Sequence, residues 1–296
     1  MTVIRTFSFL LLTFGTIPLS SIVGQTPTAP AESHHKKHVL VIAESNGWQH
    51  DSIPDAMAAV YEMGNESGLW DTQLRTDTGL LTLHDLPSNG KSLEYFDAVV
   101  FASTSGEMTL RDDQKRDLLA FVHDMGRGFV GIHGALDTNF DWPEYGKMLG
   151  GYFDQHPWGT FNAPIRNEQP SSSIVRHFPA EFHKWDEIYQ SKDWSRSDVD
   201  VLLSLDPTQL DYSEPKVHRA DHDFAVAWVK HYGKGRVFYS SLGHTPESWK
   251  DPDIRTMYFE AIKWVLGMTD GDIVTHPMPS AKPKGQNTPE QPTRKR

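Results

Sequence analysis

Residues 128–137 read Gly128-Phe129-Val130-Gly131-Ile132-His133-Gly134-Ala135-Leu136-Asp137, and this stretch decides the fold that we expect. A short apolar run ends at His133, and a turn of small residues and an aspartate follow. This order is typical of a buried parallel strand that presents a reactive side chain at its carboxyl end. Gly131 and Gly134 flank the histidine, as glycines flank the serine of a nucleophile elbow. With an imidazole in this position we expect proton transfer or metal binding, the alternative being an ordinary core histidine.

Both ends of the chain have the composition of segments outside the fold. Residues 1–24 have the basic, apolar and small-residue regions of a secretory signal peptide, and the apolar part is too short to span a bilayer. Residues 25–37 are rich in Pro, Ala and Ser, which predicts a linker, and residues 277–296 predict a disordered tail. There is no cysteine to form disulfides or to carry a lipid anchor. We therefore expect an exported protein, periplasmic or secreted, with a single α/β domain over residues 38–276.

Strands and helices alternate through the first half of this domain. We expect strands at His38 to Ala43, at Asp97 to Ala102 and at the run that ends in His133, with amphipathic helices between them. This rhythm implies right-handed crossovers and a doubly wound sheet in which the three strands are adjacent and parallel. The ends of the first and third strands would then place His50 and His133 at the same edge.

The second half of the domain is less regular up to Asp198. A hairpin is expected after it, formed by Phe224 to Val229 and Arg236 to Tyr239, because Gly233 and Gly235 supply the turn geometry. The formal net charge of −11 argues against non-specific binding to nucleic acid, because neutralising phosphates needs a basic face.

Four histidines follow predicted strands or stand in loops marked by glycine: His50, His133, His156 and His244. Ligands of open α/β sheets bind at the carboxyl edge, so we expect at least three of these histidines to converge there. Together with Glu187 they would form a site that binds zinc or moves protons. The spacings match no local metal motif such as H-E-x-x-H, so both chemistries stay open.

Several short blocks together resemble the ThuA-like (trehalose utilisation) family. They occur in family order over residues 38–269: Gly47-Trp48-Gln49-His50, residues 128–137, Gly150-Gly151-Tyr152-Phe153, His156-Pro157, Asp186-Glu187-Ile188-Tyr189, Ala227-Trp228, residues 233–239 and Gly243-His244. The resemblance implies a flavodoxin-like layered α/β domain with a mostly parallel central sheet, as in the class I glutamine amidotransferases. It also implies a link to sugar metabolism through 3-keto-sugars. Because those amidotransferases have a cysteine where His133 stands, we do not expect this chain to perform their reaction.

These blocks supply the residues of the predicted site. We expect His133, Glu187 and His244 to be catalytic. Substrate contacts are expected from other polar and aromatic residues of the same blocks: His50, Trp48, Asp137, Tyr152, His156 and Trp228.

A 3-keto group makes the neighbouring C2 proton acidic, which defines what the site must do. Elimination or isomerisation of such a sugar needs a base, a carbonyl polariser and a proton donor, and histidines with a carboxylate can fill these roles. Alternatively, a divalent metal such as zinc, held by His133, His156 and His244, polarises the ketone. No nucleotide cofactor is expected.

Two other classes of function fit the same residues. A metal-assisted hydrolase of a carbohydrate ester or amide would use an activated water. A non-catalytic carbohydrate-binding protein would instead stack sugars on aromatic rings, for which the candidates are Trp48, Tyr152, Trp158 and Trp228. In each case the expected partner is a small carbohydrate, with no nucleic acid and no membrane span.

Overall fold

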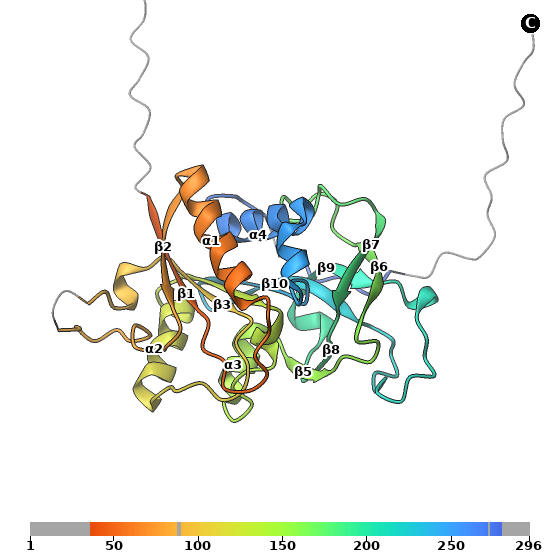
Figure 1. The fold of residues 1–296 in the computed structure, drawn as a ribbon, viewed down its shortest axis with the longest axis horizontal. Coiled ribbons are helices and arrows are strands. Elements are labelled where there is room, and N and C mark those ends of the chain that lie inside the picture. Colours follow the sequence, from red (N-terminus) through yellow and green to blue (C-terminus); the bar gives the residue numbers. More distant parts are fainter. Residues whose placement is uncertain (1–35, 88–89, 272, 280–296) are drawn as a thin grey trace, which may run out of the picture. The chain divides into compact units, whose positions relative to one another are not determined.

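The computed structural model describes residues 36–87, 90–271 and 273–279 (Figure 1). The expected signal peptide, nearly all of the expected linker and most of the expected tail therefore lie outside the described residues. The first strand already begins at Lys37, one residue before the predicted domain boundary. None of the helices in the described ranges is long and apolar enough to cross a membrane.

A nine-stranded sheet forms the centre of the fold, in the order β2-β1-β3-β4-β11-β10-β9-β6-β7. The bounds of its strands, in that order, are Trp70–Arg75, Lys37–Ile42, Ala98–Ala102, Gly128–Ile132, Gly235–Ser240, Ala225–Tyr232, Asp200–Leu205, Thr160–Asn167 and Glu181–Glu187. The first five are mutually parallel, and only β10 and β6 run in the reverse direction. The β2-β1-β3-β4 order is that of flavodoxin-like folds, so the predicted fold class with a mostly parallel central sheet is confirmed.

Helices cover both faces of the parallel half of the sheet, which explains why its central strands β3 and β4 are apolar along their whole length. Alternate residues of a strand point to opposite faces. Val39 and Val41 pack in the core beneath α1 and α4, whereas Leu40 and Ile42 pack in the core beneath α2 and α3. Figure 1 shows the two helix layers on either side of the sheet. The helix bounds are α1 (Ile53–Ser67), α2 (Asp112–His123), α3 (Pro143–Leu149) and α4 (Pro252–Val265).

The arrangement predicted for the central strands is confirmed. β1, β3 and β4 are adjacent and parallel, and β10 and β11 form the expected antiparallel hairpin. The carboxyl ends of β1, β3, β4 and β11 consequently lie at one edge. Short 3-10 segments lie between the longer elements: η1 (Leu93–Tyr95), η2 (His133–Leu136), η3 (Arg196–Asp198), η4 (Pro207–Gln209) and η5 (Pro246–Lys250).

The prediction of an irregular stretch up to Asp198 was wrong, because four strands lie within it. β6 and β7 form a hairpin that extends the main sheet beyond β9, with β7 at its edge. β5 (Tyr152–Gln155) and β8 (Gln190–Lys192) pair with each other in a separate two-stranded sheet. These strands are short or half exposed, so they lack the continuous apolar runs that mark the central strands. The hairpin matters for function because it brings Glu187 to the carboxyl edge.

Candidate active site

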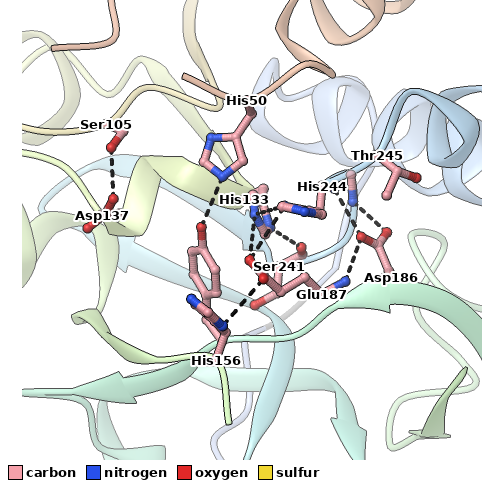
Figure 2. Close-up of polar contacts among 12 residues, drawn as sticks. His50, Ser105, His133, Asp137, His156, Asp186, Glu187, Ser241, His244 and Thr245 are labelled. Atoms are coloured by element: carbon pink, nitrogen blue, oxygen red, sulfur yellow. Dashed lines mark hydrogen bonds and ion pairs between the residues drawn. The ribbon is translucent and has the colours of Figure 1, made fainter. Parts of the chain in front are cut away.

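Four side chains that are far apart in the sequence meet at the carboxyl edge of the sheet. His50 follows β1, His133 follows β4 directly, Glu187 ends β7 and His244 follows β11. One nitrogen or oxygen atom of each lies within 4.8 Å of those of the other three. Figure 2 shows these side chains turned toward one another, and we call them the His/Glu cluster. The predicted convergence of histidines at this edge is thus confirmed.

His133 lies at the centre of the cluster and is fully buried. Its Nδ1 lies 2.6 Å from the carbonyl oxygen of Ser241. Because a carbonyl oxygen can only accept, Nδ1 carries a proton and donates it to Ser241, and Nε2 faces the cluster. Nε2 lies 3.0 Å from His244 Nδ1 and 3.6 Å from Glu187 Oε2. The backbone contact with Ser241 therefore fixes the direction of the imidazole.

Glu187 connects the histidines through its two carboxylate oxygens. Oε2 lies 3.4 Å from His244 Nδ1, and Oε1 lies 3.4 Å from His156 Nδ1. Burial alone would raise the pKa of Glu187, but the neighbouring imidazoles, above all His133, outweigh it and hold that pKa below its ordinary value. Glu187 is therefore an ionised carboxylate among imidazoles.

His50 supplies a neutral imidazole on the pocket side of the cluster. Burial, with the nearby rings of His133 and His244, lowers the pKa of His50 to about 3. Its Nε2 lies 3.4 Å from the Tyr189 hydroxyl, whereas its buried Nδ1 has no hydrogen-bond partner within the described ranges. A buried nitrogen without a partner costs free energy.

Asp186 positions the cluster from behind, on the opposite face of β7 from Glu187. Its fully buried carboxylate accepts hydrogen bonds from the backbone N–H groups of Gly243 at 2.8 Å and His244 at 3.0 Å. It also accepts from the Ser248 hydroxyl at 2.9 Å and from the Glu187 N–H at 2.9 Å. Asp186 thus ties the loop after β11 to the end of β7, although burial raises its pKa.

A pocket of about 410 Å³ opens beside the cluster. Its lining consists of Trp48, His50, Asp137, Phe153, His156, Glu187, Tyr189 and His244. Asp137 faces it with a carboxylate that accepts a hydrogen bond from Ser105 Oγ at 2.7 Å, and burial raises the pKa of Asp137. The pocket combines aromatic walls with convergent polar groups, as small-molecule sites commonly do.

Two predicted substrate contacts lie outside this pocket. Trp228 is fully buried, and its indole N–H donates to the carbonyl of Leu149 at 2.9 Å. Tyr152 is 6% exposed, and its hydroxyl bonds to backbone groups at the start of α3. Trp158 packs against rings of the core, so only Trp48 of the proposed stacking platform reaches the pocket. The four aromatic residues therefore do not form the predicted stacking platform.

Sequence reasoning missed four residues of the site. Phe153 and Tyr189 line the pocket, Asp186 anchors it, and Ser241 orients His133. The first three stand inside the family-like blocks, beside residues that were singled out. Ser241 acts through its backbone carbonyl, which no side-chain pattern can indicate.

Three imidazoles and one carboxylate form a donor set that suits zinc or a similar divalent ion. The N–H of His133 on a backbone carbonyl is also the contact that commonly orients metal-binding histidines. The group that could hold a metal differs from the predicted set, because His50 and Glu187 join His133 and His244 and His156 is not part of it. His156 lies outside this group: its Nδ1 is 3.4 Å from Glu187 Oε1, and its ring stacks on Phe153.

Comparisons with known proteins agree with this architecture. A family model described as trehalose utilisation, ThuA, matches residues 38–265. A ThuA-like protein from Bacteroides uniformis superposes with a TM-score of 0.64 at 23% identity, covering 81% of this chain and 95% of its own. A ThuA-like protein from Parabacteroides merdae superposes with a TM-score of 0.61 at 17% identity, covering 83% of this chain and 94% of its own. A cytoplasmic protein from Salmonella typhimurium LT2 superposes with a TM-score of 0.50 at 14% identity, covering 77% of this chain and 99% of its own. No curated protein matches significantly. At these identities the similar structures establish the fold alone.

Proposed function

Because the chain belongs to the ThuA (trehalose utilisation) family, we propose that it is an exported enzyme that acts on 3-keto-sugars or keto-glycosides. The family description points to carbohydrate metabolism. The observation that carries the proposal is the His/Glu cluster, which opens into a pocket with aromatic walls and two further titratable groups, Asp137 and His156. This constellation suits acid–base chemistry. With no cysteine in the chain, thiol chemistry is excluded.

The proposed reaction begins with removal of the proton at C2, next to the ketone at C3. The electron pair of the C2–H bond forms a C1=C2 double bond as the C1–O bond breaks, and the leaving oxygen takes up a proton. Asp137 is suited to be the base, because burial raises its pKa toward the working range of a general base. His156 is suited to protonate the leaving group, because its imidazole lines the pocket and its Nδ1 lies 3.4 Å from Glu187 Oε1.

The cluster contributes to this reaction as a polariser. His50, His133, Glu187 and His244 would hold a divalent ion, which when bound supplies Lewis-acid polarisation of a ketone and a neighbouring hydroxyl. Other groups of the chain hold the cluster in position. Asp186 keeps His244 and Glu187 at a fixed separation, and the carbonyl of Ser241 keeps His133 Nε2 directed inward. A preorganised site of this kind needs no rearrangement as charge develops on the sugar.

The proposal is tested by comparing an oxidised and an unoxidised form of the same glycoside. We expect turnover of the 3-keto form only, because the parent glycoside has no acidic C2 proton. Metal analysis of the purified protein and activity after chelation and zinc readdition test the cluster. Glu187→Gln should lower both metal content and turnover, the latter by roughly 10²–10⁴-fold. Glu247→Gln is the matched control, since that side chain is 73% exposed. Equal rates on both glycosides contradict the proposal.

A metal-assisted hydrolase is the second candidate, since the same donor set suits activation of a water. Activity on a carbohydrate ester or amide that needs no ketone would favour it. The non-catalytic alternative has less support, because two of its four stacking residues, Tyr152 and Trp228, are buried.

A further inference from the structure

The edge strand β7 carries an exposed tryptophan close to the active site. Trp185 is 63% exposed, and its side chain makes no hydrogen bond or ring contact within the part of the chain that the structure describes. Tryptophan is usually well buried, so an indole left in solvent on a sheet edge calls for a ligand or a partner. Trp185 stands two positions before Glu187, which ends the same strand.

The alternation of β7 places Trp185 on the same face as Glu187. The β6–β7 pairing is regular from end to end, so successive side chains point to opposite faces. Lys184 bonds to Asp251 at the start of α4 at 2.6 Å, and Asp186 bonds to η5. Both therefore face the layer that contains α4. Trp185 and Glu187 consequently share the other face, at a spacing of about 7 Å along the strand.

The neighbouring strand supplies polar groups on this face. Thr160 is opposite Glu187, and Asn162 is opposite Trp185. Asn162 is exposed, and its amide forms no hydrogen bond within the described ranges. The chain from His156 in the pocket leads directly into this strand. A surface of Thr160, Asn162 and Trp185 therefore continues from Glu187 and His156 at the pocket toward solvent.

We propose that Trp185 and Asn162 form a second sugar subsite, which holds the ring attached through the C1 oxygen. This inference rests on the proposed function. One ring would occupy the pocket beside the His/Glu cluster, and the ring attached through the C1 oxygen would stack on Trp185. A sugar ring has an apolar C–H face for the indole and hydroxyls at its rim for the amide of Asn162. Continuity with the pocket identifies the second sugar ring as the occupant.

The test compares kinetics on a 3-keto-disaccharide and on methyl 3-keto-glucoside. Trp185→Ala should raise KM for the disaccharide about 10-fold, equivalent to about 1.4 kcal/mol, and leave kcat nearly unchanged. KM for the methyl glycoside should also stay nearly unchanged. Trp185→Phe should keep most of the affinity, because a ring remains. Tyr61→Ala is the matched control, since Tyr61 is an aromatic residue of α1 that is 48% exposed.

Other outcomes would overturn the subsite. One is an equal loss on both substrates, and another is a change of oligomeric state in Trp185→Ala without a change in KM, which would make Trp185 an interface residue. If the wild-type protein turns over neither ketone, the proposed function fails while the subsite is still tested by calorimetry. The unoxidised disaccharide should then bind more tightly than methyl glucoside, and only its binding should weaken in Trp185→Ala. Equal binding of both sugars by the wild type contradicts the subsite.

Discussion

His133 has a backbone φ of 41°, in the left-handed region that non-glycine residues seldom occupy. The conformation turns the chain sharply after β4, at the point where the imidazole enters the His/Glu cluster. Two contacts hold it there. The Tyr239 hydroxyl donates to the His133 carbonyl at 2.9 Å, and the Ser241 carbonyl accepts from Nδ1. Strain held by surrounding contacts is typical of functional positions.

This geometry determines which substitution tests His133. His133→Ala would leave a cavity and an unpaired Ser241 carbonyl, so part of its effect would be on stability. Asparagine tolerates positive φ better and is the cleaner change. We expect His133→Asn to lower turnover by roughly 10²–10⁴-fold and to lower metal content, with the circular dichroism spectrum retained. His84→Asn is the control because its side chain is 71% exposed. Full activity in His133→Asn would exclude the histidine from the chemistry.

The turn from β4 into η2 depends on close approach of backbone at Gly134. A Cβ at this position would lie 2.7 Å from the carbonyl oxygen of Thr104 and 3.0 Å from Cε1 of His50. We therefore expect Gly134→Ala to cost roughly 1–3 kcal/mol of stability and to displace His50. Urea unfolding and metal content measure the two effects. Gly271→Ala, where the nearest atom lies at 3.5 Å, should be near neutral. If Gly134→Ala unfolds at the same urea concentration as the wild type and has the same metal content, the turn accommodates the Cβ and the argument is wrong.

Asp206 joins the end of β9 to η4 and to β6, and it should make stability depend on pH. Burial would raise its pKa, but hydrogen bonds from Gln209 and Thr208, with the charge of Arg166, lower it below the ordinary 3.8. A lowered folded-state pKa means that the stabilisation is fully present above the unfolded value and is lost as pH falls through the folded value. Asp206→Asn should thus have a lower Tm than the wild type at pH 7, and the difference should shrink well below pH 3.8. Exposed Asp85→Asn is the control, and a difference constant with pH would contradict the argument.

The sequence was sufficient to predict the elements whose pattern is local. β3 and β4 are apolar throughout, and β1 is apolar from Val39 onward, because both faces of these strands are covered. The glycines of the β10–β11 turn mark that hairpin. β6 and β7 could not be predicted in this way. β6 has three buried residues in a row between polar ones, and β7 alternates exposed and half-buried residues that are largely polar, so neither has the apolar run of a central strand. β5 pairs with β8, which lies far along the chain.

The site was predictable only where side chains carry the signal. The three histidines His50, His133 and His244 were named because they follow predicted strands or stand in glycine-marked loops. Glu187 was named because it lies in a family-like block, and the four side chains do meet. Trp228 was misplaced because a tryptophan on a central strand has the same sequence appearance whether it faces a ligand or the core. Which face it occupies depends on the bulged register of β10 against β9, and this register is a property of the folded sheet.

For the molecule as a whole, export stays a prediction that the chain's amino-terminal composition supports. The apolar segment between Phe7 and Ile17 has the length of a signal peptide core and is shorter than a bilayer span. We expect the mature protein to begin near Gln25. The mass of the periplasmic or secreted protein, measured by mass spectrometry, shows at which residue it begins. An intact Met1 on protein recovered from the cytoplasm would contradict export.

The whole fold brings the ends of β1, β4, β7 and β11 around one pocket, and the reaction proposed there can be observed before any bond to the leaving group breaks. In heavy water, reversible abstraction should place deuterium at C2 of a 3-keto-glycoside, because the base exchanges its proton with solvent. Asp137→Asn should abolish this exchange and leave metal content unchanged, since the amide cannot act as a base. Asp141→Asn, exposed in the adjacent loop, is the control. NMR of the recovered sugar reports the label. Cleavage without C2 labelling in the product or substrate would favour attack by water, and the hydrolase alternative would then replace proton abstraction.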